Sequence, residues 1–294
     1  MFKPFIMLCM KPLNKIGPFE LYKKRPNTIS RGYLYTSELE FDVPNVDRKR
    51  LVRVYLPSTY DFNNPDQRFA VMYMMDGKNL FDDYTSYVGE WHVDEAIEKR
   101  IRQHKEACIV VGIDSAKKDI DRTLEMTPHS DHLAYHDDDV ELGYAEDLAD
   151  SIMNFLKPLI DETFFTLSDY LNTAIGGSSM GGLMAFYMGM KYKDEISYSL
   201  CFSPAFLVYQ KDFFKKRLQK TVFDHEEYGR FYFYCGGQEF ERRFEDLTFY
   251  TFKYLRRKGF KDDQLRIVYD SRMKHHESAW SKYFPDALSY WLDE

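Results

Sequence analysis

The stretch "NTAIGGSSMGGLMAFY" (residues 172–187) joins two apolar segments through a glycine-rich turn. The first segment is short and ends in glycines, as a buried strand does, and the second continues with the length of a helix. Gly177, Ser179 and Gly181 form the pattern G-x-S-x-G. A serine on a sharp strand-to-helix turn has a strained backbone, so the residues two positions away must be small. The stretch predicts either a plain glycine bend or a turn that presents Ser179 as a nucleophile.

Strand-like and helix-like segments alternate on both sides of this turn. Continuous apolar runs predict six buried strands, at 70–75, 107–113, 172–177, 198–203, 230–235 and 265–270. Helical patterns fall between and after them, at 90–104, 143–162, 180–192, 210–220, 240–258 and 277–292. Apolar strands that alternate with helices form a parallel sheet covered on both faces. Two earlier segments, 33–41 and 50–56, alternate polar and apolar residues, as strands near a sheet edge do.

This order of elements is the layout of the α/β-hydrolase fold. We expect an eight-stranded, mostly parallel sheet with helices on both faces. Residues 1–30, with prolines spaced through them, are expected to form an irregular N-terminal arm. No repeat or linker divides residues 31–294, which we interpret as a single domain. In this fold the nucleophile is followed along the chain by an acid after the seventh strand and a histidine after the eighth.

A serine nucleophile needs a general base, and the base needs an acid that orients it. His275 and His276 both follow the last predicted strand, so the order of strands leaves either as the base. The seventh strand ends in "YFYCGGQEFE" (232–241), where Glu239 is the first carboxylate and Glu241 falls inside the next predicted helix. Glu239 is therefore the predicted acid, although a carboxylate at that place also suits the N-terminus of a helix.

The second oxyanion donor of this fold comes from the loop after the third strand. "MYMMDGKNLFDD" (72–83) contains that loop, and the backbone N–H of Lys78 is the candidate beside that of Met180. Gly77 would let the backbone approach the substrate closely. An Asp-Gly pair is also common in ordinary turns.

Several blocks of the sequence, taken in order, resemble the putative esterase family, which includes ferric enterochelin esterases, feruloyl-type esterases and mycolyltransferases. The blocks are "VMYMMDGKNLFDD", "GEWHVDEAI", "IVVGID", "RTLEMTP", "KPLIDETF", "GGSSMGGLMAFY", "FSPAF", "GGQE" and "HHESAW", and the resemblance covers residues 33 to 292. It implies an α/β-hydrolase that uses Ser179, an acid at Glu239 and a histidine. The ending of the family is similar to H-x-E-x-x-W, which implies His275 as the base and leaves His276 as the variable position.

The resemblance also bears on the substrate. It implies an oxyanion donor at Lys78, where many relatives carry a neutral residue, so a charged side chain here either favours an anionic substrate or points into solvent. Within the matching blocks, we expect Asn79, Trp91 and Arg122 to contact the substrate.

These residues predict a serine carboxylic-ester hydrolase that works through an acyl-enzyme, on a siderophore, feruloyl or short-chain acyl ester. An acyltransferase or a thioesterase would use the same triad. A catalytically silent binding module is the alternative of a different class, and the presence of serine, acid, histidine and oxyanion turn disfavours it.

We expect no cofactor and no metal. "HSDHLAYHDDD" (129–139) brings His129, His132 and His136 to spacings that suit a metal site on a helix. A polar loop that shapes the substrate site, or a lid, is the favoured interpretation because a triad needs no metal.

Composition limits the partners and the compartment. The chain of 294 residues has a formal net charge of −7, which argues against nucleic acid as its partner. No apolar run approaches the length of about 18 residues that a membrane span needs, and "FIMLCM" near the N-terminus is too short for a secretion signal. The four cysteines show no C-x-x-C spacing. We therefore expect a cytoplasmic protein with a small-molecule ester as its partner, and the sequence indicates no oligomeric state.

Overall fold

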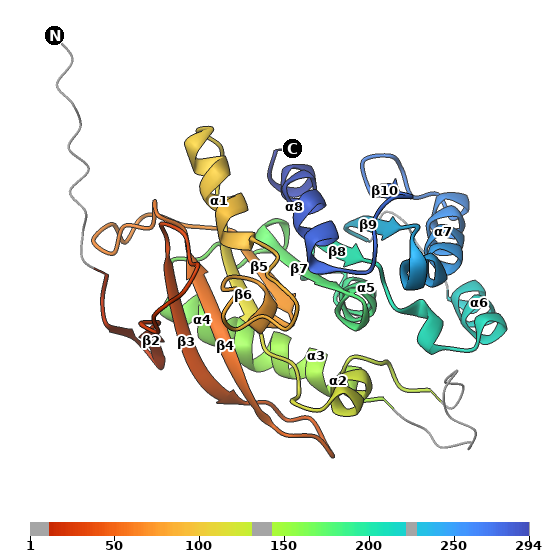
Figure 1. The fold of residues 1–294 in the computed structure, drawn as a ribbon, viewed down its shortest axis with the longest axis horizontal. Helices are drawn as coiled ribbons and strands as arrows, with labels where there is room; N and C mark the ends of the chain where they lie inside the picture. Colours follow the sequence, from red (N-terminus) through yellow and green to blue (C-terminus); the bar gives the residue numbers. More distant parts are fainter. Residues whose placement is uncertain (1–11, 131–142, 222–227, 294) are drawn as a thin grey trace, which may run out of the picture.

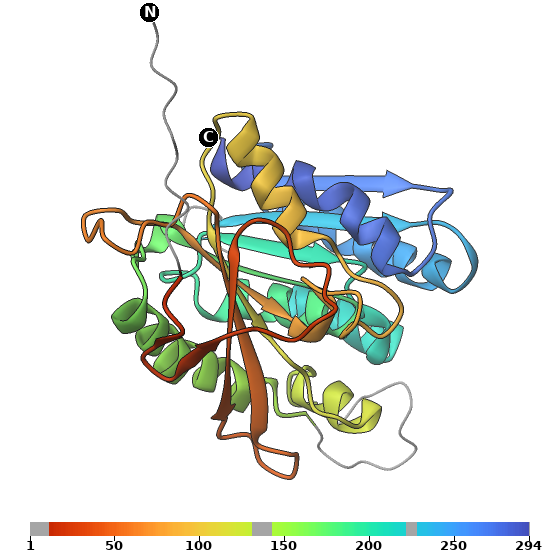
Figure 2. The same cartoon turned by 60° about the vertical axis from the view of Figure 1, so that its left-hand side comes forward.

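The computed structural model describes residues 12–130, 143–221 and 228–293. A twisted sheet runs through the molecule, with helices on either side of it (Figures 1 and 2). Its ten strands have the order β1-β2-β3-β4-β6-β5-β7-β8-β9-β10. Their bounds are β1 (Lys15–Ile16), β2 (Phe19–Leu21), β3 (Tyr33–Glu40), β4 (Lys49–Leu56), β5 (Val71–Met75), β6 (Ile109–Ile113), β7 (Thr173–Ser178), β8 (Tyr198–Phe202), β9 (Arg230–Gly236) and β10 (Leu265–Asp270).

Strands β5 to β10 pair with one another in parallel, and β1 to β4 form an antiparallel extension that joins them where β4 meets β6. Strands β5 to β9 are buried along almost their whole length, as their continuous apolar sequence predicts. All eight predicted strands are present, and the α/β-hydrolase class is confirmed. The added strands are β1 and β2, within the segment expected to be irregular. With only two and three residues they are too short to show an alternating pattern.

Helices cover both faces of the sheet. They are α1 (Val93–Arg102), α2 (Asp119–Glu125), α3 (Ala145–Ser151), α4 (Lys157–Thr163), α5 (Met180–Lys191), α6 (Lys211–Lys220), α7 (Arg242–Arg257) and α8 (Glu277–Leu292), with a π-helical turn, η2 (Ile152–Leu156), between α3 and α4. Helices α1 and α8 pack on one face in a single apolar cluster. The other face is covered by α3 to α7. No helix in the described ranges is both long and apolar enough to cross a membrane.

The parallel strands place their following turns at one edge of the sheet. Because β5, β7, β8, β9 and β10 run in the same direction, the segments after their carboxyl ends meet there. These segments contain the 3₁₀ turn η1 (Gly77–Asn79), Ser179, Ser203, the 3₁₀ turn η6 (Glu239–Glu241) and His275. The topology therefore gathers the predicted site at the carboxyl edge of the sheet.

Candidate active site

Ser179 occupies a strained turn between β7 and α5. Its backbone has φ 56° and ψ −118°, a conformation that a residue with a side chain rarely adopts. Neighbouring backbone holds it there: the Ser179 N–H donates to the Phe202 carbonyl over 2.9 Å, and the Ser179 carbonyl accepts from Ala205 at 2.9 Å. A Cβ at Gly177 would lie 2.7 Å from the Gly181 backbone, so these two positions need glycine. The bend is therefore a strained turn, as the glycine spacing predicts for a turn that presents a serine.

His275 and Glu241 form a close pair at the same edge of the sheet. The Nδ1 atom of His275 lies 2.5 Å from Oε2 of Glu241, whose side chain is fully buried, while the His275 side chain is 16% exposed. A carboxylate at Nδ1 fixes the tautomer in which Nε2 carries the free lone pair and can accept a proton. His275 therefore has the partner that a general base requires.

The predicted acid, Glu239, does not contact His275 through any hydrogen bond or ion pair of the structure. Its side chain is 66% exposed and makes a 2.6 Å ion pair with Lys274. Glu239 begins η6 with φ 51°, and this tight turn brings Glu241 to the interior two residues later. The first carboxylate after the strand is thus turned outward, and the second one is the partner of the histidine.

Three donors surround the carboxylate of Glu241. Its Oε1 accepts the N–H of Gly236 at 2.7 Å and the hydroxyl of Ser203 at 2.6 Å, while Oε2 faces His275. The Ser203 oxygen in turn accepts the indole N–H of Trp280 over 3.1 Å. A buried carboxylate with this many donors is held in one orientation. Sequence reasoning missed both Glu241 and Ser203.

Aromatic rings pack around the His275 imidazole. The ring of Phe244 stacks on it with 4.3 Å between centroids, and Phe240 and Trp280 meet it edge-on at 5.5 and 5.0 Å. The neighbouring His276 plays a different part, because its Nδ1 accepts the N–H of Ser278 and caps α8. The two histidines thus have different partners, Glu241 for His275 and the backbone of Ser278 for His276.

The predicted oxyanion donors lie on the two turns beside Ser179. Met180 is the first residue of α5, so its N–H is one of those that lack an acceptor within the helix. Lys78 is the middle residue of η1, and a Cβ on the preceding Gly77 would lie 2.6 Å from the Gly112 backbone. The Lys78 ammonium lies 5.8 Å from the ring centre of Tyr87.

Arg122 anchors the residue before η1. Its Nε and Nη2 donate to the two carboxylate oxygens of Asp76, each over 2.7 Å. Burial acts to raise the pKa of the Asp76 carboxyl, but the charge and hydrogen bonds of Arg122 outweigh it and hold this pKa below its usual value. The Arg122 side chain is 25% exposed, and its main contact is the ion pair with Asp76.

Asn79 and Trp91, also predicted to contact the substrate, both make contacts within the protein. The side chain of Asn79 accepts from the Tyr87 N–H at 3.1 Å and donates to Glu277 at 3.4 Å. Trp91 is only 2% exposed and packs on Trp280 with 5.5 Å between rings. The burial of Trp91 contradicts the expectation of direct substrate contact. Trp91 instead belongs to the core that packs against Trp280.

The histidine-rich stretch at 129–139 is only partly described. The backbone N–H of His129 donates to Glu146 over 3.1 Å, whereas His132 and His136 lie outside the described residues. Among the cysteines, Cys108, Cys201 and Cys235 are buried and free.

A sheet of this order with a strained serine turn at its carboxyl edge defines an α/β-hydrolase. Residues 44–289 match the model of the family described as putative esterase. The chain therefore belongs to the putative esterase family, and it is a carboxylic-ester hydrolase.

Individual proteins are similar to this chain in sequence or in fold. A protein of Bacillus subtilis (strain 168) named "Uncharacterized protein YbbA" is 26% identical over 256 residues, which cover 83% of this chain and 92% of the relative. The siderophore hydrolase EstA from Aspergillus nidulans has a similar fold, with a TM-score of 0.67 and 16% identity over 86% of this chain and 94% of EstA. A ferulic acid esterase aligns with a TM-score of 0.66 and 16% identity, over 90% of this chain and 99% of that one.

Proposed function

We propose that Ser179, His275 and Glu241 form the catalytic triad of this ester hydrolase. The observation that carries the proposal is the pairing of His275 with a fully buried, hydrogen-bonded Glu241 at the carboxyl edge of the sheet, where the strained Ser179 turn also lies. Glu241 therefore takes the role that the order of residues along the chain predicted for Glu239.

In the proposed mechanism, Nε2 of His275 removes the proton of the Ser179 hydroxyl while its oxygen attacks the ester carbonyl. The N–H groups of Met180 and Lys78 stabilise the negative charge that develops on the carbonyl oxygen. The imidazolium then protonates the leaving alcohol, and Glu241 stabilises its charge. Water attacks the acyl-enzyme by the same route and releases the acid.

We further propose that the substrate carries an aromatic acyl group. Aromatic side chains stand exposed near both parts of the site, with Tyr87 80% exposed beside η1 and Phe240 49% exposed against His275. Such rings stack on a planar aromatic group and gain little from a short aliphatic one. Feruloyl esters fit this description, and the ferulic acid esterase named above has the same fold.

A labelling experiment tests the triad. A fluorophosphonate probe should modify the wild-type chain at Ser179, and Ser179→Ala should abolish labelling and lower kcat by roughly a thousandfold or more with an unchanged melting temperature. Full activity of that variant would refute the assignment of the nucleophile.

A separate comparison tests the acyl group. Methyl ferulate should have a higher kcat/KM than methyl acetate, and Tyr87→Ala should lower the value for the ferulate about 2- to 10-fold while leaving the acetate unchanged. Phe155→Ala is the control, since Phe155 is 43% exposed on η2. An equal loss with both esters, or the same loss in the control, would contradict an aromatic subsite.

A further inference from the structure

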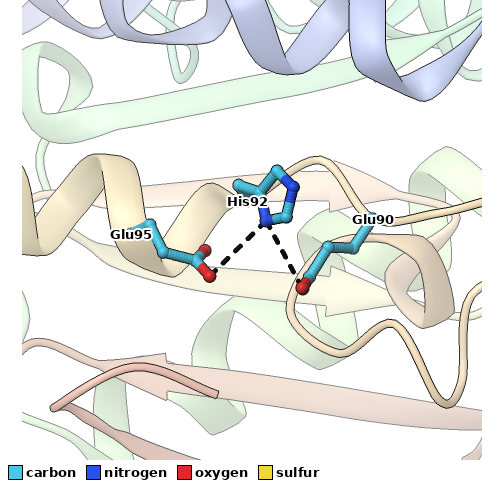
Figure 3. A group of neighbouring side chains, drawn as sticks. All are labelled: Glu90, His92 and Glu95. Atoms are coloured by element: carbon cyan, nitrogen blue, oxygen red, sulfur yellow. Dashed lines mark ion pairs between the residues drawn. The ribbon is translucent and has the colours of Figure 1, made fainter. Parts of the chain in front are cut away.

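Three side chains with metal-binding atoms meet where the loop after η1 enters α1. Glu90 and His92 come from that loop and Glu95 from the first turn of the helix, and both carboxylates face Nδ1 of His92 (Figure 3). The Nδ1 atom lies 3.3 Å from Oε1 of Glu90 and 3.4 Å from Oε1 of Glu95. All three potential ligand atoms lie within 4.8 Å of one another.

These separations suit a shared cation better than direct hydrogen bonds. A charge-assisted bond between an imidazolium and a carboxylate measures about 2.7–2.9 Å, shorter than either contact here. Two ligands at about 2.0–2.2 Å from one zinc ion, at a tetrahedral angle, are about 3.4 Å apart. The two separations from Nδ1 are therefore those of ligands on one metal ion.

Glu90 supplies an independent sign that a ligand is needed. Its side chain is 1% exposed, and Oε1 accepts from the Thr28 hydroxyl at 2.8 Å. The other oxygen, Oε2, is buried without a hydrogen-bond partner among the described residues. A half-satisfied buried carboxylate is costly unless a positive charge balances it.

Further acidic side chains lie around these three residues. Asp83 accepts the N–H of Glu90 at 3.0 Å, and the adjacent Asp94 is fully buried.

The site is open to solution on its other side. The side chains of His92 and Glu95 are 50% and 40% exposed, so a cation can enter and water can complete its coordination. One imidazole with two carboxylates suits zinc, whereas Mg²⁺ and Ca²⁺ prefer oxygen ligands alone.

We propose that Glu90, His92 and Glu95 bind one Zn²⁺ ion. The ion joins the loop to α1, and through Thr28 it also holds the N-terminal segment. It touches no reacting atom, so its part is structural, and the inference does not depend on the proposed triad. In the sequence, only the histidines at 129–139 had suggested a metal site.

Calorimetric titration of the chelator-treated, full-length chain with ZnCl₂ tests the proposal. We expect one Zn²⁺ bound per chain, more tightly than Mg²⁺ or Ca²⁺, with affinity at least about tenfold weaker in His92→Asn and in Glu95→Gln. His104→Asn is the matched control: His104 is an exposed histidine with φ 58° at the other end of α1, close to the φ of 54° at His92. It should bind as the wild type does.

The melting temperature gives a second readout that needs no enzyme activity. Zinc at a hundredfold excess over Kd should raise Tm by about 5 °C in the wild type and in His104→Asn, and much less in His92→Asn. A double variant, His132→Asn with His136→Asn, should keep the binding and the shift. Binding that survives in His92→Asn but disappears in this double variant would place the metal elsewhere and overturn the proposal. So would the absence of zinc binding in the wild type.

Discussion

Replacing Glu241 and Glu239 by glutamine, one at a time, distinguishes the proposed acid from the one that the order of residues predicts. In Glu241→Gln, the side-chain oxygen is retained at the position that accepts from Gly236 and Ser203, at 2.7 and 2.6 Å. The amide NH₂ must then face Nδ1 of His275, where Oε2 now lies at 2.5 Å. This arrangement moves the imidazole proton to Nε2, and the base can no longer accept the proton of the serine.

The loss should be large because the tautomer is wrong in every molecule. We expect kcat to fall by roughly 10³- to 10⁴-fold, or about 4–5.5 kcal/mol in the barrier. Glu239→Gln should keep activity within about twofold, since it removes only an exposed ion pair with Lys274. Steady-state hydrolysis of an aryl ester measures both, and thermal unfolding checks that each variant is folded. A large loss in Glu239→Gln with an active Glu241→Gln would refute the reasoning.

Three further variants probe the surroundings of the site. Ser203→Ala removes one donor to Glu241 and should lower kcat about tenfold with little change in KM, a split that stopped-flow and steady-state kinetics on the same ester resolve. Gly181→Ala puts a Cβ 2.8 Å from that of Met75 and should lower the free energy of unfolding by about 1–3 kcal/mol in urea titrations. Because the folded-state pKa of Asp76 lies below its unfolded value, its stabilisation is complete above the unfolded pKa and is lost as pH falls through the folded one. Asp76→Asn should therefore destabilise the chain more at pH 7 than at pH 2, and an equal loss at both would contradict the ion pair.

The fold and two members of the proposed triad were accessible from sequence because they follow from order along the chain. Continuous apolar strands fix a parallel sheet, and the glycine spacing around Ser179 fixes the turn. His275 follows from its place after the last strand and from the family resemblance.

The order of residues predicts Glu239 as the acid, whereas the proposed acid is Glu241, because that order does not show in which direction a 3₁₀ turn points each side chain. A signal was available in Phe244, three residues after Glu241. Residues three apart share a face of a helix, so the Phe244 ring marks Glu241 as inward-facing. For Trp91 the sequence allowed two interpretations, because a tryptophan in a matching block can contact substrate or pack in the core. Here it is 2% exposed and packs in the core.

The contact of Trp280 with both His275 and Ser203 gives the enzyme a built-in optical probe. The chain has three tryptophans, so the other two, Trp91 and Trp291, are few enough to be replaced by phenylalanine. The remaining indole lies 5.0 Å from the imidazole, where a positive charge on that ring perturbs its excited state. Emission from Trp280 should then follow acylation and deacylation in real time, with natural, unlabelled esters as substrates.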